Sequence, residues 1–126
     1  MILVPLGGKQ VVGEKPASKL RKAGLKMLKN DFSQFDLSKG KTISKWTTGW
    51  ELRPADENVK EYIGILWDRK RLRFTLRLID TIRHSVRDKN YLPIVNYDPT
   101  AYSHEERLEI FIDDMRKQLQ DWTKNW

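Results

Sequence analysis

The sequence predicts an all-α protein in which a basic N-terminal helical arm precedes a helical bundle built on two long antiparallel helices. Three observations support this fold class. No proline interrupts residues 56–89, apolar side chains from Trp67 onward recur at helical spacing, and residues 103–124 combine a capping sequence with an apolar stripe. We therefore expect a basic arm over residues 1–53 and a helical bundle over residues 54–126.

Composition adds a strong charge asymmetry to this prediction. The chain has 126 residues, a net charge of +7 and no cysteine, which excludes a disulfide scaffold. Residues 1–50 hold ten of the 24 Lys and Arg but only three of the 17 Asp and Glu, so the whole excess of positive charge lies there. Such a segment favours binding to a polyanion, with a solvated tail as the alternative. No apolar stretch approaches the roughly 18 residues needed to span a bilayer.

The arm is expected to contain two short helices joined by a glycine-containing turn. Ser18 can cap the first, from Lys19 to about Asn30, in which lysines recur at steps of three and four residues and so share one face. Thr42 can cap the second, which Pro54 stops, and its tryptophans are expected to pack on a neighbour rather than stack on bases. The lysines of the first helix are Lys19, Lys22, Lys26 and Lys29.

The central segment, from Asp56 to about Lys89, is expected to form one long helix with a bend at Gly64. Its apolar side should pack on the core. Its other side carries an arginine stripe with three interpretations: a solvated face, a contact with acidic residues of a neighbouring subunit, or a surface for nucleic-acid phosphates. The stripe consists of Arg69, Arg73, Arg77, Arg83 and Arg87.

The final part of the chain predicts the clearest helix. Two prolines and three tyrosines mark residues 90–102 as an extended connector. Ser103 to Glu106 fits a capping box, and the apolar stripe that follows should pack antiparallel to the central helix.

Few residues offer catalytic or metal-binding chemistry. The two histidines, His84 and His104, have no metal-ligand spacing. Gly40-Lys41-Thr42 matches the end of a phosphate loop, but Phe35 occupies the position where that loop needs its first glycine. We expect no enzymatic activity, no cofactor, no metal and no small-molecule substrate.

With Lys9 to Lys45 as a basic arm and Glu57 to Trp126 as a helical bundle, the layout resembles the major coat proteins of archaeal filamentous viruses of the lipothrixvirus and rudivirus type. The resemblance implies many subunits that wrap double-stranded DNA and form a helical filament in the virion. The partners would be further copies of the chain or a related coat subunit, with membrane contact only in an enveloped particle. The separation of lysine in the arm from arginine on the long helix departs from that family.

The sequence thus predicts a structural nucleoprotein subunit that binds double-stranded DNA without sequence preference. Two alternatives stay open: a small regulatory DNA-binding protein of the cytoplasm or nucleoid, with residues 19–50 as a helix-turn-helix variant, and a protein–protein adaptor whose basic arm docks on an acidic partner. The expected phosphate contacts are Lys19, Lys22, Lys26, Lys29, Lys39, Lys41 and Lys45, with Arg69, Arg73 and Arg77 as a second set.

Overall fold

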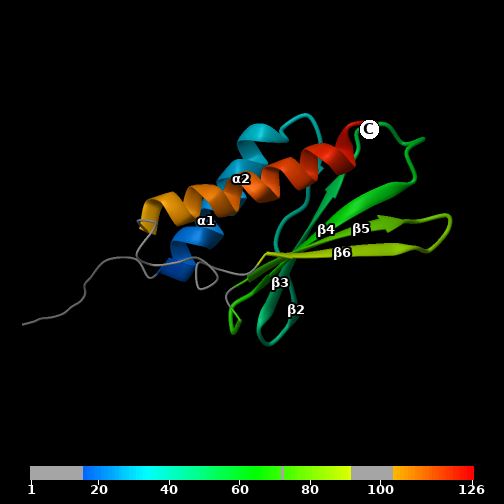
Figure 1. Ribbon diagram of the computed structural model, residues 1–126. Coiled ribbons are helices and arrows are strands. Elements are labelled where there is room, and N and C mark those ends of the chain that lie inside the picture. Colours follow the sequence, from blue (N-terminus) through cyan, green and yellow to red (C-terminus); the bar gives the residue numbers. More distant parts are fainter. Residues whose placement is uncertain (1–15, 72, 92–103) are drawn as a thin grey trace, which may run out of the picture.

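Two helices cover one face of an antiparallel β-sheet (Figure 1). The computed structural model describes residues 16–71, 73–91 and 104–126. In chain order the described elements are α1 (Pro16–Asp31), β1 (Asp36–Leu37), β2 (Lys41–Ser44), β3 (Thr47–Arg53), β4 (Glu61–Asp68), β5 (Arg73–Asp80), β6 (Val86–Tyr91) and α2 (His104–Thr123). The prediction of an all-α protein is therefore wrong, because the centre of the chain forms a sheet.

The sheet is a meander with short additions at one side. β3, β4 and β5 are consecutive antiparallel neighbours, and β6 continues the sheet beyond β5. On the other side both β1 and β2 pair with β3, each along a different part of that strand. Since β3 pairs with β4, residues on both sides of position 53 belong to one sheet.

The segment predicted as one long helix, residues 56–89, forms β4, β5 and most of β6. In β5 the buried Phe74, Leu76 and Leu78 alternate with less buried residues, which is the two-residue period of a strand with one covered face. Trp67 and Phe74, seven residues apart, also fit one side of a helix. Here they oppose each other across the β4–β5 hairpin, with ring centroids 4.8 Å apart. The helical prediction failed because this spacing is compatible with both geometries.

The second helix expected in the arm is also absent. Its residues form β2 and β3, joined by a two-residue turn at Lys45 and Trp46. The helical hairpin, and the helix-turn-helix interpretation of residues 19–50, are therefore wrong. Threonines and tryptophans in this stretch favour strands, where branched and aromatic side chains pack well on a pleated surface. Trp50 is buried as expected, whereas Trp46 is 39% exposed.

The first and last predicted helices are confirmed as α1 and α2, but their packing differs from the prediction. Both lie on the same face of the sheet, and α2 packs beside α1 rather than on a central helix (Figure 1). Arg116 of α2 donates from Nε to Asp31 of α1 at 2.8 Å. The first two residues of the predicted connector, Asn90 and Tyr91, belong to β6. The rest of it, residues 92–102, and Ser103 of the predicted capping box lie outside the described residues.

The hydrophobic core fills the space between the helices and the sheet. α1 approaches the sheet closely at Gly24, where a Cβ atom would lie 2.7 Å from two ring atoms of Phe74. At the far end of β4, Trp126 packs edge-on against Phe35 and donates from Nε1 to Glu61 at 2.8 Å. The buried members of the core are Leu20, Met27, Leu28, Phe32, Trp50, Leu52, Ile63, Ile65, Trp67, Phe74, Leu76, Leu78, Phe111, Ile112, Met115 and Leu119.

An aspartate fixes each of the two turns that flank β5. Asp68 accepts backbone N–H bonds from Lys70 and Arg71 at 2.9 and 3.0 Å. In the next turn Asp80 accepts two N–H bonds from the second and third residues that follow it, both at 2.9 Å. These donors favour the ionised carboxylate, so the pKa of Asp68 and of Asp80 is held below its ordinary value, in each case chiefly by the N–H three residues on.

Candidate nucleic-acid interface

The lysines predicted on the first helix lie together on the outer side of α1. The opposite side of the helix is anchored in the core by Leu20, Met27 and Leu28. All four lysines are exposed, and they span ten residue steps, or about 15 Å along the helix axis. We call this surface the lysine face; it consists of Lys19, Lys22, Lys26 and Lys29.

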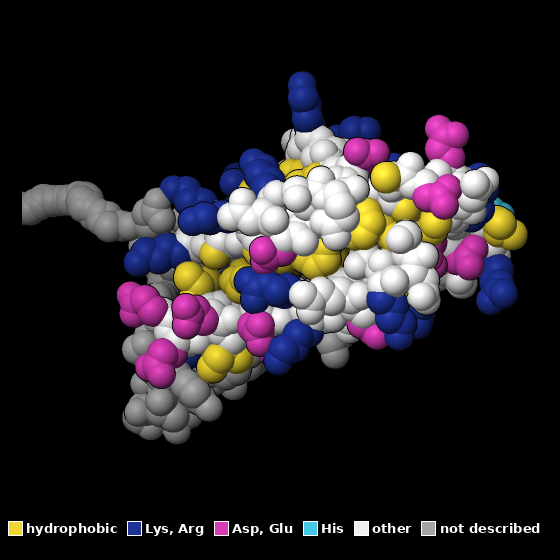
Figure 2. Space-filling model, turned by 90° about the horizontal axis from the view of Figure 1, so that it is seen from above, with side chains coloured by type: hydrophobic (Ala, Val, Ile, Leu, Met, Phe, Trp, Pro, Cys, Tyr) yellow, Lys and Arg dark blue, Asp and Glu magenta, His cyan; other side chains and the backbone are white. Residues whose placement is uncertain are grey.

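The lysine face is a local feature of a mixed surface. Figure 2, which looks onto the helix layer, shows Asp and Glu side chains among the Lys and Arg side chains, with hydrophobic side chains between them. Some of the acids are neutralised within α2, where Asp113 contacts Lys117 at 3.1 Å and Arg116 at 3.1 Å. The hydrogen bond from Lys117 is the main reason that the pKa of Asp113 is lowered. A polyanion would therefore meet net positive charge on α1 rather than over the whole helix layer.

A second group of predicted residues meets at the tips of two hairpins. The β2–β3 turn and the β4–β5 turn lie side by side, because the N–H of Arg69 donates to the carbonyl oxygen of Trp46 at 2.9 Å. Three cationic groups surround the Trp46 ring: Arg69 at 4.9 Å, Lys45 at 5.1 Å and Lys70 at 5.9 Å from its centroid. We call Lys45, Trp46, Arg69 and Lys70 the Trp46 cluster. Sequence reasoning selected Lys45 and Arg69 but missed the tryptophan and Lys70.

A third group lines a hollow on the sheet face that the helices leave open. Lys39, Lys41 and Arg77 contribute to its wall, together with Tyr62 of β4. The hollow has a volume of about 440 Å³, and two strand glycines lie in it. Its lining consists of Ser38, Lys39, Lys41, Ile43, Gly49, Trp50, Glu51, Tyr62, Gly64, Leu66, Arg77 and Ile79.

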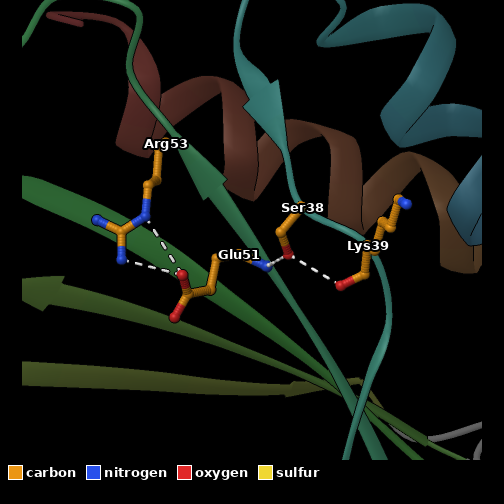
Figure 3. Close-up of polar contacts among 4 residues, drawn as sticks. All are labelled: Ser38, Lys39, Glu51 and Arg53. Carbon is orange, nitrogen blue, oxygen red and sulfur yellow. Dashed lines mark hydrogen bonds and ion pairs between the residues drawn. The ribbon is translucent and has the colours of Figure 1, made fainter.

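Polar contacts hold the rim of this hollow in place (Figure 3). The N–H of Glu51 donates to Ser38 Oγ at 2.8 Å, and Ser38 Oγ donates to the carbonyl oxygen of Lys39 at 3.1 Å. Arg53 forms an ion pair with Glu51 at 2.9 Å and places its guanidinium group 4.2 Å from the ring centroid of Tyr62. Glu51 therefore neutralises Arg53, and the positive charge around the hollow comes from Lys39, Lys41 and Arg77.

The arginine stripe of the predicted central helix is dispersed by the sheet. Arg73 and Arg77 remain on one face of β5, the face away from the helices. Arg83 lies in the β5–β6 turn, and Arg87 pairs with Leu78 and so belongs to the other face. Arg73 Nε is buried and makes no hydrogen bond to any described residue. The five arginines therefore cannot act as one phosphate-binding surface.

The start of the lysine face and the Trp46 cluster lie toward the same end of the molecule (Figure 1). Gly24, at the middle of α1, lies close to the ring of Phe74, which is near the β4–β5 turn that carries Arg69. Figure 1 shows the first turn of α1 and the two hairpin tips toward that end.

Comparisons with known proteins do not identify the chain. No family model matches it, and searches of curated proteins and of solved structures likewise find no match. The resemblance to filamentous-virus coat proteins rested on an all-helical layout that the fold does not have. Within the described residues, no group of three or more His, Asp or Glu side chains could hold a metal ion, and neither helix is long and apolar enough to cross a membrane.

Proposed function

We propose that the chain binds nucleic acid through the phosphate backbone and without reading base sequence. The observation that carries this proposal is the lysine face: four exposed ammonium groups on one side of a helix whose other side is fixed in the core. Lysine contacts phosphate as a point charge, while base reading relies on Arg, Asn or Gln at a groove.

The dimensions of the lysine face suit a long polyanion. Along about 15 Å a DNA duplex presents about nine phosphates, because it carries one charge per about 1.7 Å of its axis. Double-stranded DNA is therefore a suitable ligand, and a single strand meets the same requirement for phosphate. Each phosphate contact releases counterions, which supplies the free energy of such sequence-independent binding.

A charge-reversal experiment tests this proposal. The variant carries Lys26→Glu and Lys29→Glu on the lysine face. The control carries Lys117→Glu and Lys124→Glu on α2, which changes the net charge by the same amount at lysines already paired with Asp113 and Asp121. Binding of a random-sequence duplex, measured by fluorescence anisotropy at several salt concentrations, should weaken strongly in the variant and only mildly in the control. The slope of log affinity against log salt should fall by about 2 in the variant, close to 0.9 per lost contact.

Two outcomes would contradict the proposal. An equal loss in both proteins would mean that net charge alone matters, and a salt slope near zero in the unmodified chain would mean that phosphate is not bound. The adaptor alternative, in which the basic surface docks on an acidic protein, predicts association that survives nuclease treatment. Nucleic-acid binding predicts that nuclease abolishes it.

A further inference from the structure

We propose that the Trp46 cluster is a stacking platform for an unpaired nucleobase and its neighbouring phosphates. This inference rests on the proposed function and specifies part of its ligand: a single-stranded segment. It concerns a surface different from the lysine face, so the two can be tested apart.

Trp46 differs from the other described tryptophans in its surroundings. Trp50 and Trp67 are 7% and 4% exposed and belong to the core, and Trp122 and Trp126 pack against that core. Trp46 is 39% exposed at the tip of a hairpin, where it adds nothing to the core. A large aromatic ring held at a hairpin tip is therefore available to a ligand.

The cations around Trp46 have no carboxylate partner among the described residues. The nearest acid along the chain, Asp68, is already occupied by the backbone of the turn and by Arg71, whose Nη1 lies 3.3 Å from it. Cation–π contacts attract each cationic group to the indole, but the groups also repel one another, because all three lie within 5.9 Å of the same ring centroid. A ligand that supplies negative charge beside the ring would relieve this repulsion.

A nucleotide unit matches both properties of the site. Its base offers a flat π surface that can stack on the indole in place of a cationic group. The cationic groups can then pair with the phosphates of the nucleotide. In a duplex the bases are stacked inside and cannot reach an external ring, so the base must be unpaired. Stacking is tolerant of base identity because every base has a π face, which agrees with binding that ignores sequence.

The backbone around the cluster is well suited to hold the ring in position. The hydrogen bond from Arg69 to the Trp46 carbonyl ties two hairpin tips together, and the Asp68 carboxylate fixes the turn that carries Arg69 and Lys70. Both hairpins continue into the centre of the sheet through β3, β4 and β5. The platform is thus mounted on the most extensively paired part of the fold.

The test measures the affinity of the full chain for three end-labelled probes: an oligothymidylate of about 15 nucleotides, an abasic strand of the same length, and a duplex. The variants are Trp46→Ala and Trp46→Phe. The control is Ile82→Ala, which removes another exposed apolar side chain, 68% exposed, from the turn at the opposite end of β5. Circular dichroism establishes that each variant is folded.

We expect Trp46→Ala to weaken oligothymidylate binding about tenfold and to leave abasic-strand and duplex binding within about twofold of the original. Trp46→Phe should retain most of the affinity, and Ile82→Ala should change nothing. The Trp46 emission, obtained as the difference between the unmodified chain and Trp46→Phe, should be quenched by oligothymidylate and not by the abasic strand.

The proposal of a stacking platform is overturned if Trp46→Ala leaves oligothymidylate binding unchanged, or if it weakens the binding of all three probes equally. In either case binding by the unmodified chain would leave the proposed phosphate-binding function standing. If the unmodified chain binds none of the three probes, both proposals fail.

Discussion

In each of the two turns that flank β5, one aspartate carboxylate fixes the backbone geometry. Asp68 is the more informative of the pair because its side chain is only 16% exposed and also pairs with Arg71. The backbone N–H of Arg71 and the other contacts favour the ionised form, which is why the pKa lies below its ordinary value of 3.8. Protonation of this one group therefore weakens the turn that carries Arg69 and Lys70.

Replacing Asp68 with Asn should destabilise the protein at neutral pH, and replacing it with Ala should cost about 1–2 kcal/mol of unfolding free energy. Because the pKa of Asp68 is lower in the folded chain than in the unfolded chain, its stabilising contribution is complete above the unfolded value. It is lost as the pH falls through the folded value. The difference between the original chain and Asp68→Asn, measured by urea unfolding, should therefore shrink between neutral pH and about pH 3.

Asp36→Asn serves as the control, because it removes an exposed carboxylate in β1. It should leave the stability within about 0.5 kcal/mol of the original at either pH. A difference for Asp68→Asn that stays constant over this pH range would show that its charge is not what stabilises the turn.

Gly24 is a second residue whose identity the packing explains. By helix propensity alone, Ala at this position should stabilise α1 by about 1 kcal/mol. The contact with Phe74 outweighs this gain, since a methyl group placed 2.7 Å from the ring forces a shift in a buried part of the core.

Gly24→Ala should therefore lower the unfolding free energy by about 1 kcal/mol, as the sum of an overpacking cost of about 1–3 kcal/mol and the propensity gain. In a Phe74→Leu background, Gly24→Ala should cost less than it does in the original chain, because the smaller side chain makes room. Lys26→Ala, on the exposed side of the same helix, should be nearly neutral. A Gly24→Ala protein more stable than the original in thermal unfolding would refute this account.

At the scale of elements, two helices were predicted correctly from the sequence, whereas the strands between them were predicted as helices. α1 and α2 were predictable because an apolar stripe with a polar opposite side allows only one period. The predicted cap of the first helix was wrong, since Ser18 lies inside α1, which begins at Pro16. In β5 the alternation from Arg73 to Leu78 was present, but it was read together with Trp67 as a helical stripe. The missed signal is Asp68 followed by three basic residues, which forms the hairpin turn between two β-rich runs.

The same limit applies to the candidate interface. The lysine face depends on one helix and was predictable from spacing. The Trp46 cluster depends on two hairpins lying side by side, and the spacing of residues within one segment contains no information about which strands are neighbours. Lys45 and Arg69 were therefore selected for charge alone, without the ring between them.

Trp126 connects the end of the α2 segment to two other parts of the fold. Its ring packs against Phe35, 5.0 Å between centroids, and its Nε1 donates to Glu61 at the start of β4. Trp126→Ala should lower the unfolding free energy by about 2 kcal/mol, the sum of the ring contact and the hydrogen bond.

Trp126→Phe should lose about half of that amount, since it keeps the ring contact and loses the donor. Asn125→Ala, at an exposed neighbouring position, is the matched control and should be nearly neutral. Chemical denaturation of the three variants tests this prediction, and equal losses for Ala and Phe would mean that only the hydrogen bond matters.

At the scale of the whole molecule, the Trp46 cluster and Trp126 lie at opposite ends of the central strands. The lysine face begins near the end of the sheet that holds the Trp46 cluster, while Trp126 packs at the other end, beside Glu61. Seven residue steps of β4 divide these ends, or about 23 Å. Under the proposal made above, a single-stranded ligand would therefore bind at the end of the sheet away from Trp126.

The position of Trp126 also has a practical consequence for handling the protein. A fluorophore, affinity tag or sensor surface joined after this residue would lie at the end of the molecule opposite the two hairpin tips. Immobilisation through that point would leave the first turn of α1 and the Trp46 cluster accessible to the solution. Attachment at Lys45 or Lys70 would obstruct the Trp46 cluster.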